Sequence, residues 1–88
     1  MKEYVRELSR EEIRDSFILV ERKSLPFFPP AGKIFNLCLK ELCLIVKIDS
    51  LPGRAAGRLR VPNLSKYFKT GEKARIVKKG AEYELLKG

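Results

Sequence analysis

The chain has 88 residues, of which 44% are hydrophobic, and 19 Lys and Arg against 11 Asp and Glu give it a formal net charge of +8. A chain this short buries only about 60 to 65% of the surface that its unfolded form exposes, so we expect a single domain over residues 1–88 with one modest core. Histidine is absent and there are only two cysteines, which excludes an imidazole base and leaves a zinc site without ligands, so neither a metal nor a cofactor is expected.

The first 20 residues predict a short helix followed by a strand. Ser9 and Glu12 form a Ser-x-x-Glu capping box, which predicts a helix over about residues 9–16. Residues 3–8 alternate imperfectly between polar and apolar, which fits either a first strand or an extension of that helix. The run Phe-Ile-Leu-Val at 17–20 is rich in β-formers and predicts a strand.

Residues 22–33 are rich in proline and end in Gly-Lys. Three prolines remove backbone donors and bias the preceding residues toward extended conformations, so we expect an extended arm or loop without regular structure. Arg22, Lys23, Ser24 and Lys33 provide cationic and hydroxyl groups that can hold phosphates. The neighbouring aromatic pair at 27 and 28 either contacts a partner or plugs one end of the core.

Two strands are predicted at residues 34–39 and 41–49, with Lys40-Glu41 as the tight turn between them. Cys38 and Cys43 lie five residues apart in this stretch. Odd spacing along a strand puts two side chains on opposite faces, so we expect free, reduced, buried thiols and no disulfide between them.

Residues 50–57 form a second flexible connection, and three arginines lie in or after it: Arg54, Arg58 and Arg60. The small residues around Arg54 allow backbone amides to approach phosphates. The period-two spacing of Arg58 and Arg60 predicts that both lie on one face of the following strand.

The C-terminal segment predicts a helical turn at residues 63–68 and two strands at 73–78 and 82–86. The predicted fold is mainly β, a small closed or nearly closed pseudobarrel of about six or seven strands, with no helix longer than about three turns. A further group of lysines in this segment is explained by solubility alone, and comprises Lys66, Lys69, Lys73, Lys78 and Lys79.

The positive charge is concentrated after residue 21. Residues 1–21 hold four basic and six acidic residues, whereas residues 22–88 hold 15 basic and 5 acidic ones. With a pI near 9.8, this predicts a polyanionic partner. The chain has no Ser-His-Asp set, no Gly-rich phosphate loop and no nuclease-like carboxylate pair, so we do not expect an enzyme.

The N-terminus alternates in charge and has no apolar region typical of a signal peptide. The longest apolar runs are also far shorter than the roughly 20 residues that cross a bilayer. A cytoplasmic, soluble protein with no membrane partner is expected.

Four segments together resemble the DNA-binding pseudobarrel group, which includes the plant B-three transcription-factor domain and the recognition domains of certain restriction endonucleases. They are residues 22–33 with Phe35, residues 44–49, residues 57–62 and residues 69–76. In that group two arms flank the DNA and enter the major groove, and by position these arms would be residues 22–33 and 49–60. The last 30 residues are also similar to the AbrB-like swapped-hairpin fold, whose members dimerise to bind DNA.

We therefore expect a non-catalytic domain that grips duplex DNA through two basic loops. The candidate DNA-binding residues are Arg22, Lys23, Ser24, Lys33, Arg54, Arg58 and Arg60. Two alternatives stay open: an RNA- or ribosome-associated β-barrel protein, and a protein-interaction or regulatory module anchored by Phe27 and Phe28. A homodimer and a separate nuclease subunit are further expected forms of partnership.

Overall fold

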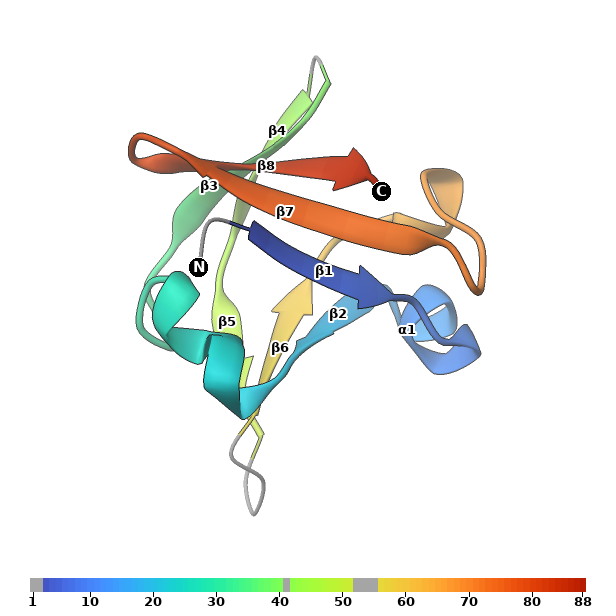
Figure 1. Cartoon of the computed structure of the whole chain (residues 1–88), viewed down its shortest axis with the longest axis horizontal. Helices are drawn as coiled ribbons and strands as arrows, with labels where there is room; N and C mark the ends of the chain where they lie inside the picture. The colour runs from blue at the N-terminus through green and yellow to red at the C-terminus, as the bar shows by residue number, and fades with distance from the viewer. Residues whose placement is uncertain (1–2, 41, 52–55) are drawn as a thin grey trace.

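A computed structural model describes residues 3–40, 42–51 and 56–88 of the chain (Figure 1). Within them, the strands are β1 (Glu3–Glu7), β2 (Phe17–Val20), β3 (Phe35–Leu39), β4 (Leu42–Val46), β5 (Ile48–Ser50), β6 (Gly57–Arg60), β7 (Lys73–Lys79) and β8 (Glu82–Lys87). The helices are α1 (Arg10–Asp15) and two 3₁₀ helices, η1 (Arg22–Phe27) and η2 (Leu64–Lys66). The prediction of a mainly β fold with only short helices is confirmed.

The strands form two sheets. The larger has the order β1-β7-β8-β3-β4 and the smaller has the order β2-β6-β5. All neighbours are antiparallel except β3 and β8, which run parallel. Lys47 alone separates β4 from β5, so one bent segment passes from the larger sheet into the smaller.

The two sheets do not close into a barrel within the described residues. The closed or nearly closed pseudobarrel is therefore not confirmed. The described residues form eight strands, where about six or seven were predicted. The second strand of the predicted hairpin, residues 41–49, is divided because the chain bends at Lys47 between the two sheets. The inner faces of both sheets nevertheless share one hydrophobic core, which includes Ile18, Leu37, Ile48, Leu59 and Ile76.

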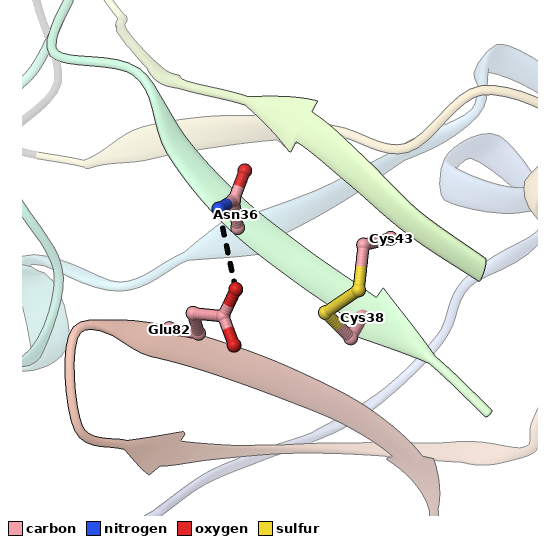
Figure 2. The surroundings of a disulfide bond; sticks show 4 residues. All are labelled: Asn36, Cys38, Cys43 and Glu82. Carbon is pink, nitrogen blue, oxygen red and sulfur yellow. Dashed lines mark hydrogen bonds between the residues drawn. A yellow bond between two sulfur atoms is a disulfide. The ribbon is translucent and has the colours of Figure 1, made fainter. Parts of the chain in front are cut away.

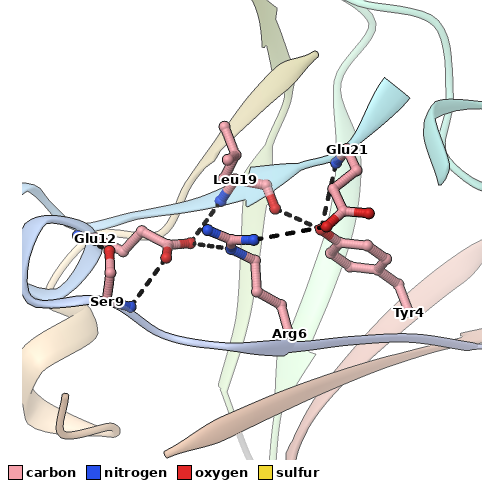
Figure 3. Close-up of polar contacts among 6 residues, drawn as sticks. All are labelled: Tyr4, Arg6, Ser9, Glu12, Leu19 and Glu21. Carbon is pink, nitrogen blue, oxygen red and sulfur yellow. Dashed lines mark hydrogen bonds and ion pairs between the residues drawn. The ribbon is translucent and has the colours of Figure 1, made fainter. Parts of the chain in front are cut away.

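A buried carboxylate joins β1 to β2, where no ladder does (Figure 3). Ser9 and Glu12 form the predicted capping box, and the Glu12 side chain is only 1% exposed. Its Oε2 accepts hydrogen bonds from the Arg6 Nε at 2.7 Å and from the Leu19 N–H at 2.8 Å, while its Oε1 accepts from the Ser9 N–H at 3.0 Å. The capping glutamate is thus also the polar link between the two sheets.

The hydrogen bonds decide the protonation of Glu12. Burial raises the pKa of its carboxyl, but the bonds from Arg6, Leu19 and Ser9 offset this, and the pKa lies below its ordinary value. Nearby, burial raises the pKa of Tyr4, whose hydroxyl donates to the Leu19 carbonyl at 2.6 Å. Glu12 is therefore ionised at neutral pH and holds a buried ion pair.

The first half of the proline-rich segment contradicts the prediction that residues 22–33 would lack regular structure, whereas residues 28–33 form no helix or strand. Residues 22–27 form the 3₁₀ helix η1, with Pro26 inside it. A 3₁₀ helix is held by hydrogen bonds between residues three apart. Here the Ser24 N–H donates to the Glu21 carbonyl and the Phe28 N–H donates to the Leu25 carbonyl, and neither bond uses the nitrogen of Pro26. The missing amide of Pro26 is therefore tolerated, and the segment folds back on the core.

The prediction of free, reduced thiols is wrong, because Cys38 and Cys43 form a disulfide (Figure 2). The two residues do not share a strand: they lie directly opposite each other on the antiparallel strands β3 and β4. Their Cα atoms are 3.9 Å apart, and side chains opposite each other across a hairpin point to the same face. Disulfides persist in oxidising surroundings and are rare in the cytosol. This bond therefore gives no support to the cytoplasmic location, which stays a prediction.

We expect reduction of this disulfide to lower the free energy of unfolding by about 2 kcal/mol, because the bond closes only a short loop. Intact mass with and without alkylation will show whether the purified chain holds the bond. Denaturation with and without a phosphine reductant then measures its contribution. A chain with Ser at both positions should be insensitive to the reductant, and equal sensitivity of both chains would contradict this expectation.

Candidate nucleic-acid interface

The two predicted arms meet at one end of the smaller sheet. Gly57, the first residue of β6, pairs with Val20 at the end of β2 and with Ser50 at the end of β5. The helix η1 begins two residues after Val20. In Figure 1, η1 lies beside the lower ends of β5 and β6. The fold therefore brings the segments around residues 22 and 57 side by side.

Gly57 is the point of closest approach between these segments. It is buried, and a Cβ built on it would lie 2.5 Å from the Ile48 Cγ2 and 3.0 Å from the Leu25 Cδ2. This glycine was predicted to let backbone amides reach phosphates. The structure gives packing as its reason instead: only a residue without a side chain lets η1 and β5 close over this end.

Three of the candidate cations are exposed on the first segment. Arg22 and Lys23 lie at the start of η1, and with Glu21 and Pro26 they line a shallow hollow. The third, Lys33, follows Gly32, whose N–H donates to the Ile48 carbonyl at 2.9 Å and so ties this part of the segment to β5. Among these three, only Lys23 has an ion pair within the described residues, at 3.7 Å from Glu21.

Ser24 does not belong to the interface. Only 2% of this residue is exposed, so its hydroxyl is not presented to a ligand. The turn of η1 points it into the protein, between the exposed Lys23 and the half-buried Leu25. This burial argues against the prediction that Ser24 contacts DNA.

Arg58 is a packing residue as much as a charge. Its guanidinium lies 4.7 Å from the centre of the Phe17 ring, a distance typical of a cation–π contact. Its Nε is buried without a hydrogen-bond partner in the described part of the chain. The side chain also lines a hollow that holds Glu11, Glu12 and Asp15. Arg58 is therefore largely engaged inside the protein.

The charge of Arg58 acts on α1. The pKa of Asp15 is lowered, chiefly by its hydrogen bond with Arg14 and further by the charges of Arg14 and Arg58. The carboxylates near Arg58 compete with a phosphate for this guanidinium. A direct DNA contact by Arg58 is thus disfavoured relative to the exposed cations.

Arg60 lies on the same outer face of β6 as Arg58, as predicted from their spacing. Arg60 is exposed, and its Nε is 3.3 Å from the Asp49 Oδ2. The Lys47 Nζ is 4.0 Å from the other oxygen of this carboxylate. Two cations thus flank one acid, which leaves a net positive charge at this point.

Lys47 was not among the predicted site residues. The alternation of β4 and β5 could have found it, since Lys47 and Asp49 have the same parity and Asp49 pairs with Arg58 on β6. Arg54, the remaining candidate, lies outside the described residues.

Phe27 and Phe28 plug the core. Phe28 is 5% exposed and stacks on Tyr83 with ring centres 5.5 Å apart, while Phe27 meets the same ring edge-on at 5.5 Å. The Tyr83 hydroxyl donates to the Phe27 carbonyl at 2.6 Å. All eight aromatic residues of the chain fall within the described part, and each is buried or half-buried. Neither an anchor for a protein partner nor an exposed stacking platform is present there.

The additional lysines do not form one cluster. Lys73 begins β7 and Lys79 ends it, so the two lie at opposite ends of a seven-residue strand. Lys66 lies on η2, and Lys79 pairs with Glu84 at 3.0 Å. These lysines therefore offer no single surface to which base readout could be assigned, and their role in solubility stays a prediction.

The described residues contain no group of three or more His, Cys, Asp or Glu side chains placed to hold a metal ion. No helix among them is long and apolar enough to cross a membrane. Comparison of the chain with known protein families, with curated proteins and with solved structures finds no match. The function must therefore be inferred from the geometry itself.

Proposed function

We propose that this protein binds duplex DNA, without catalysis, through the end of the smaller sheet where the segments around residues 22–33 and 56–60 meet. The observation that carries the proposal is the convergence of these two basic segments, far apart in the sequence, on Gly57. A nucleic-acid site needs several cations that can reach successive phosphates at once. Two loops at one edge of a sheet meet this need.

The contact residues that we assign are the exposed cations of the first segment, Arg22, Lys23 and Lys33, together with Lys47 and Arg60, which lie at the other end of β5 and β6 from Gly57. Within the described residues, the acids paired with these five cations are Glu21, which lies 3.7 Å from Lys23, and Asp49, which Lys47 and Arg60 flank. The balance at the surface is therefore positive. Such a field favours phosphate binding and speeds encounter with DNA.

Duplex DNA fits this site better than single-stranded RNA. Proteins that bind single strands stack the bases on exposed aromatic rings, and every aromatic side chain here is at least half-buried. Phosphate contacts by Arg and Lys need no such platform.

The test is a titration of a labelled duplex, a single strand and a structured RNA at two salt concentrations, with fluorescence anisotropy as the readout. In the variant with Arg22→Ala and Lys23→Ala, we expect affinity for the duplex to fall at least about tenfold. The slope of log K against log salt should fall by about two, because each lost phosphate contact lowers it by about one. Thermal stability should change little, since exposed charges contribute little to folding.

The matched control removes the same charge from the tip of the β7–β8 hairpin, through Lys78→Ala and Lys79→Ala. This pair should have the smaller effect, because no second basic loop adjoins it. If both double variants lose affinity equally, binding follows net charge alone and the two-loop site is wrong. Tighter binding of RNA than of the duplex would favour the RNA alternative.

A further inference from the structure

Each of the two sheets has two edge strands, and three of these four edges are protected. An exposed strand edge offers a row of unpaired N–H and C=O groups to any other strand. The edge of β2 is covered by side chains: the Leu19 N–H donates to Glu12, and the Leu19 carbonyl accepts from Tyr4. The edge of β5 is covered by Gly32, whose N–H donates to the Ile48 carbonyl.

The edge of β1 is protected by charge. Its sequence, Glu-Tyr-Val-Arg-Glu, places three charged residues in five positions, which is a common device against edge-to-edge pairing. The fourth edge, β4, has the sequence Leu-Cys-Leu-Ile-Val and no charge. Among the described residues, β4 pairs with β3 alone.

Apolar exposure is concentrated at this fourth edge. Ile45 is 72% exposed and Leu42 is 48% exposed, and both lie on β4. Ile34, the residue before β3, is 64% exposed and lies diagonally across from Ile45. These are three of the four large exposed hydrophobic residues in the described chain. The concentration marks β4 as a contact surface.

The disulfide shows which backbone groups of β4 are unpaired. The Cα atoms of Cys38 and Cys43 are 3.9 Å apart, close to the spacing of about 4.5 Å that is typical of a non-hydrogen-bonded antiparallel pair. Cys43 therefore turns its own N–H and C=O away from β3. By alternation Ile45 does the same. The free edge of β4 therefore presents the N–H and C=O groups of two residues, Cys43 and Ile45, to another strand.

We propose that β4 pairs antiparallel with β4 of a second copy of this chain, which joins the two larger sheets across a twofold axis at Leu44. This register overlaps all five residues and keeps inward side chains on the inward face. Cys43 of each copy lies opposite Ile45 of the other, and each such pair can exchange two backbone hydrogen bonds. Leu42 lies opposite Val46.

The self-complementarity of the strand is the reason for choosing a second copy as the partner. A twofold interface brings the same patch together from both sides, and a strand with apolar residues throughout meets only apolar residues. An acidic or basic partner segment would find no charge to pair with on β4. The surface adjoins the proposed DNA site at Lys47, which directly follows β4.

Light scattering and sedimentation over a range of concentrations test the proposal. At about 100 μM we expect a mass of twice 10.1 kDa. Ile45→Lys should weaken the dimer at least about 30-fold, because the twofold axis introduces the ammonium group twice. Val5→Lys, at the exposed residue of the charged edge β1, should leave the dimer unchanged. A monomeric mass at all concentrations, or equal effects of the two variants, would overturn the proposal.

Two further measurements guard against a variant that fails to fold. In the unaltered protein, amide hydrogen exchange at Cys43 and Ile45 should slow as the concentration rises, while concentration-independent exchange there would refute edge pairing. The effect of salt on affinity distinguishes a like-charged partner from an oppositely charged one. Each copy carries +8, so added salt should tighten this dimer by screening the repulsion, while it weakens DNA binding. A dimer that dissociates as salt rises would point to a charged interface elsewhere and exclude β4.

Discussion

Replacement of Glu12 by Ala is expected to lower the free energy of unfolding by about 3 to 5 kcal/mol, the cost of removing one partner from a buried ion pair. The carboxylate accepts hydrogen bonds from Arg6, Leu19 and Ser9. Its loss leaves a partly buried guanidinium and two amides without acceptors. Because domains of this size are stable by only about 5 to 15 kcal/mol, the variant should unfold at a much lower denaturant concentration.

The neighbouring Glu11→Ala variant is the control, since the Glu11 side chain is 71% exposed and exposed substitutions usually change stability by less than about 0.5 kcal/mol. Urea denaturation followed by circular dichroism measures both. Similar midpoints for the two variants would show that the Glu12 network contributes little.

The same network makes the stability of the folded protein depend on pH. The pKa of Glu12 is lower in the folded protein than its ordinary value, so the folded state binds its proton less tightly than the unfolded chain does. Its contribution is therefore fully present above the ordinary pKa of a glutamate and is lost as the pH falls through the lower, folded pKa. The difference in stability between the unaltered protein and Glu12→Gln should shrink over that acidic window. A difference that stays constant would contradict the assignment.

Local signals in the sequence predicted local structure well. The capping box placed α1 and the run of β-formers placed β2, because both depend on residues within one turn or one strand. The C-terminal hairpin was also located correctly, with strands at residues 73–79 and 82–87. What the sequence could not show is that Glu12 would reach across to Leu19, since this bond depends on how two sheets pack.

The wrong prediction for the cysteines applied the spacing rule for one strand to two residues that the predicted turn at Lys40-Glu41 places on different strands. The parity rule assigned Cys38 and Cys43 to opposite faces, yet the turn between them makes them cross-strand partners. Likewise, Arg58 and Arg60 share a face as predicted. Their environments nevertheless differ: Arg58 packs on the Phe17 ring beside the carboxylates of α1, whereas Arg60 is exposed. This difference depends on the tertiary fold.

Gly57→Ala is expected to lower the free energy of unfolding by about 1 to 3 kcal/mol, the range for an overpacked core. The added Cβ would meet the Ile48 Cγ2 at 2.5 Å and the Leu25 Cδ2 at 3.0 Å. The Ile48 methyl cannot yield freely, because Ile48 is 1% exposed, whereas the Leu25 Cδ2 lies at the end of a half-buried side chain on η1. The variant should therefore push η1 away from the β5–β6 end and weaken duplex binding as well.

A second substitution distinguishes this clash from a general loss of glycine. Leucine lacks the β-branched methyl of isoleucine, so Ile48→Leu removes the atom nearest to the new Cβ and should restore part of the stability and part of the DNA affinity of Gly57→Ala. The coupling between the two sites should reach about 1 kcal/mol in a double-mutant cycle. Gly88→Ala is the matched control, because its Cβ would meet neighbours only at 3.5 Å or more and should change neither property. If Gly57→Ala retains full stability and full affinity for the duplex, the two basic segments do not depend on contact at this glycine, and the proposed two-loop site loses its structural basis.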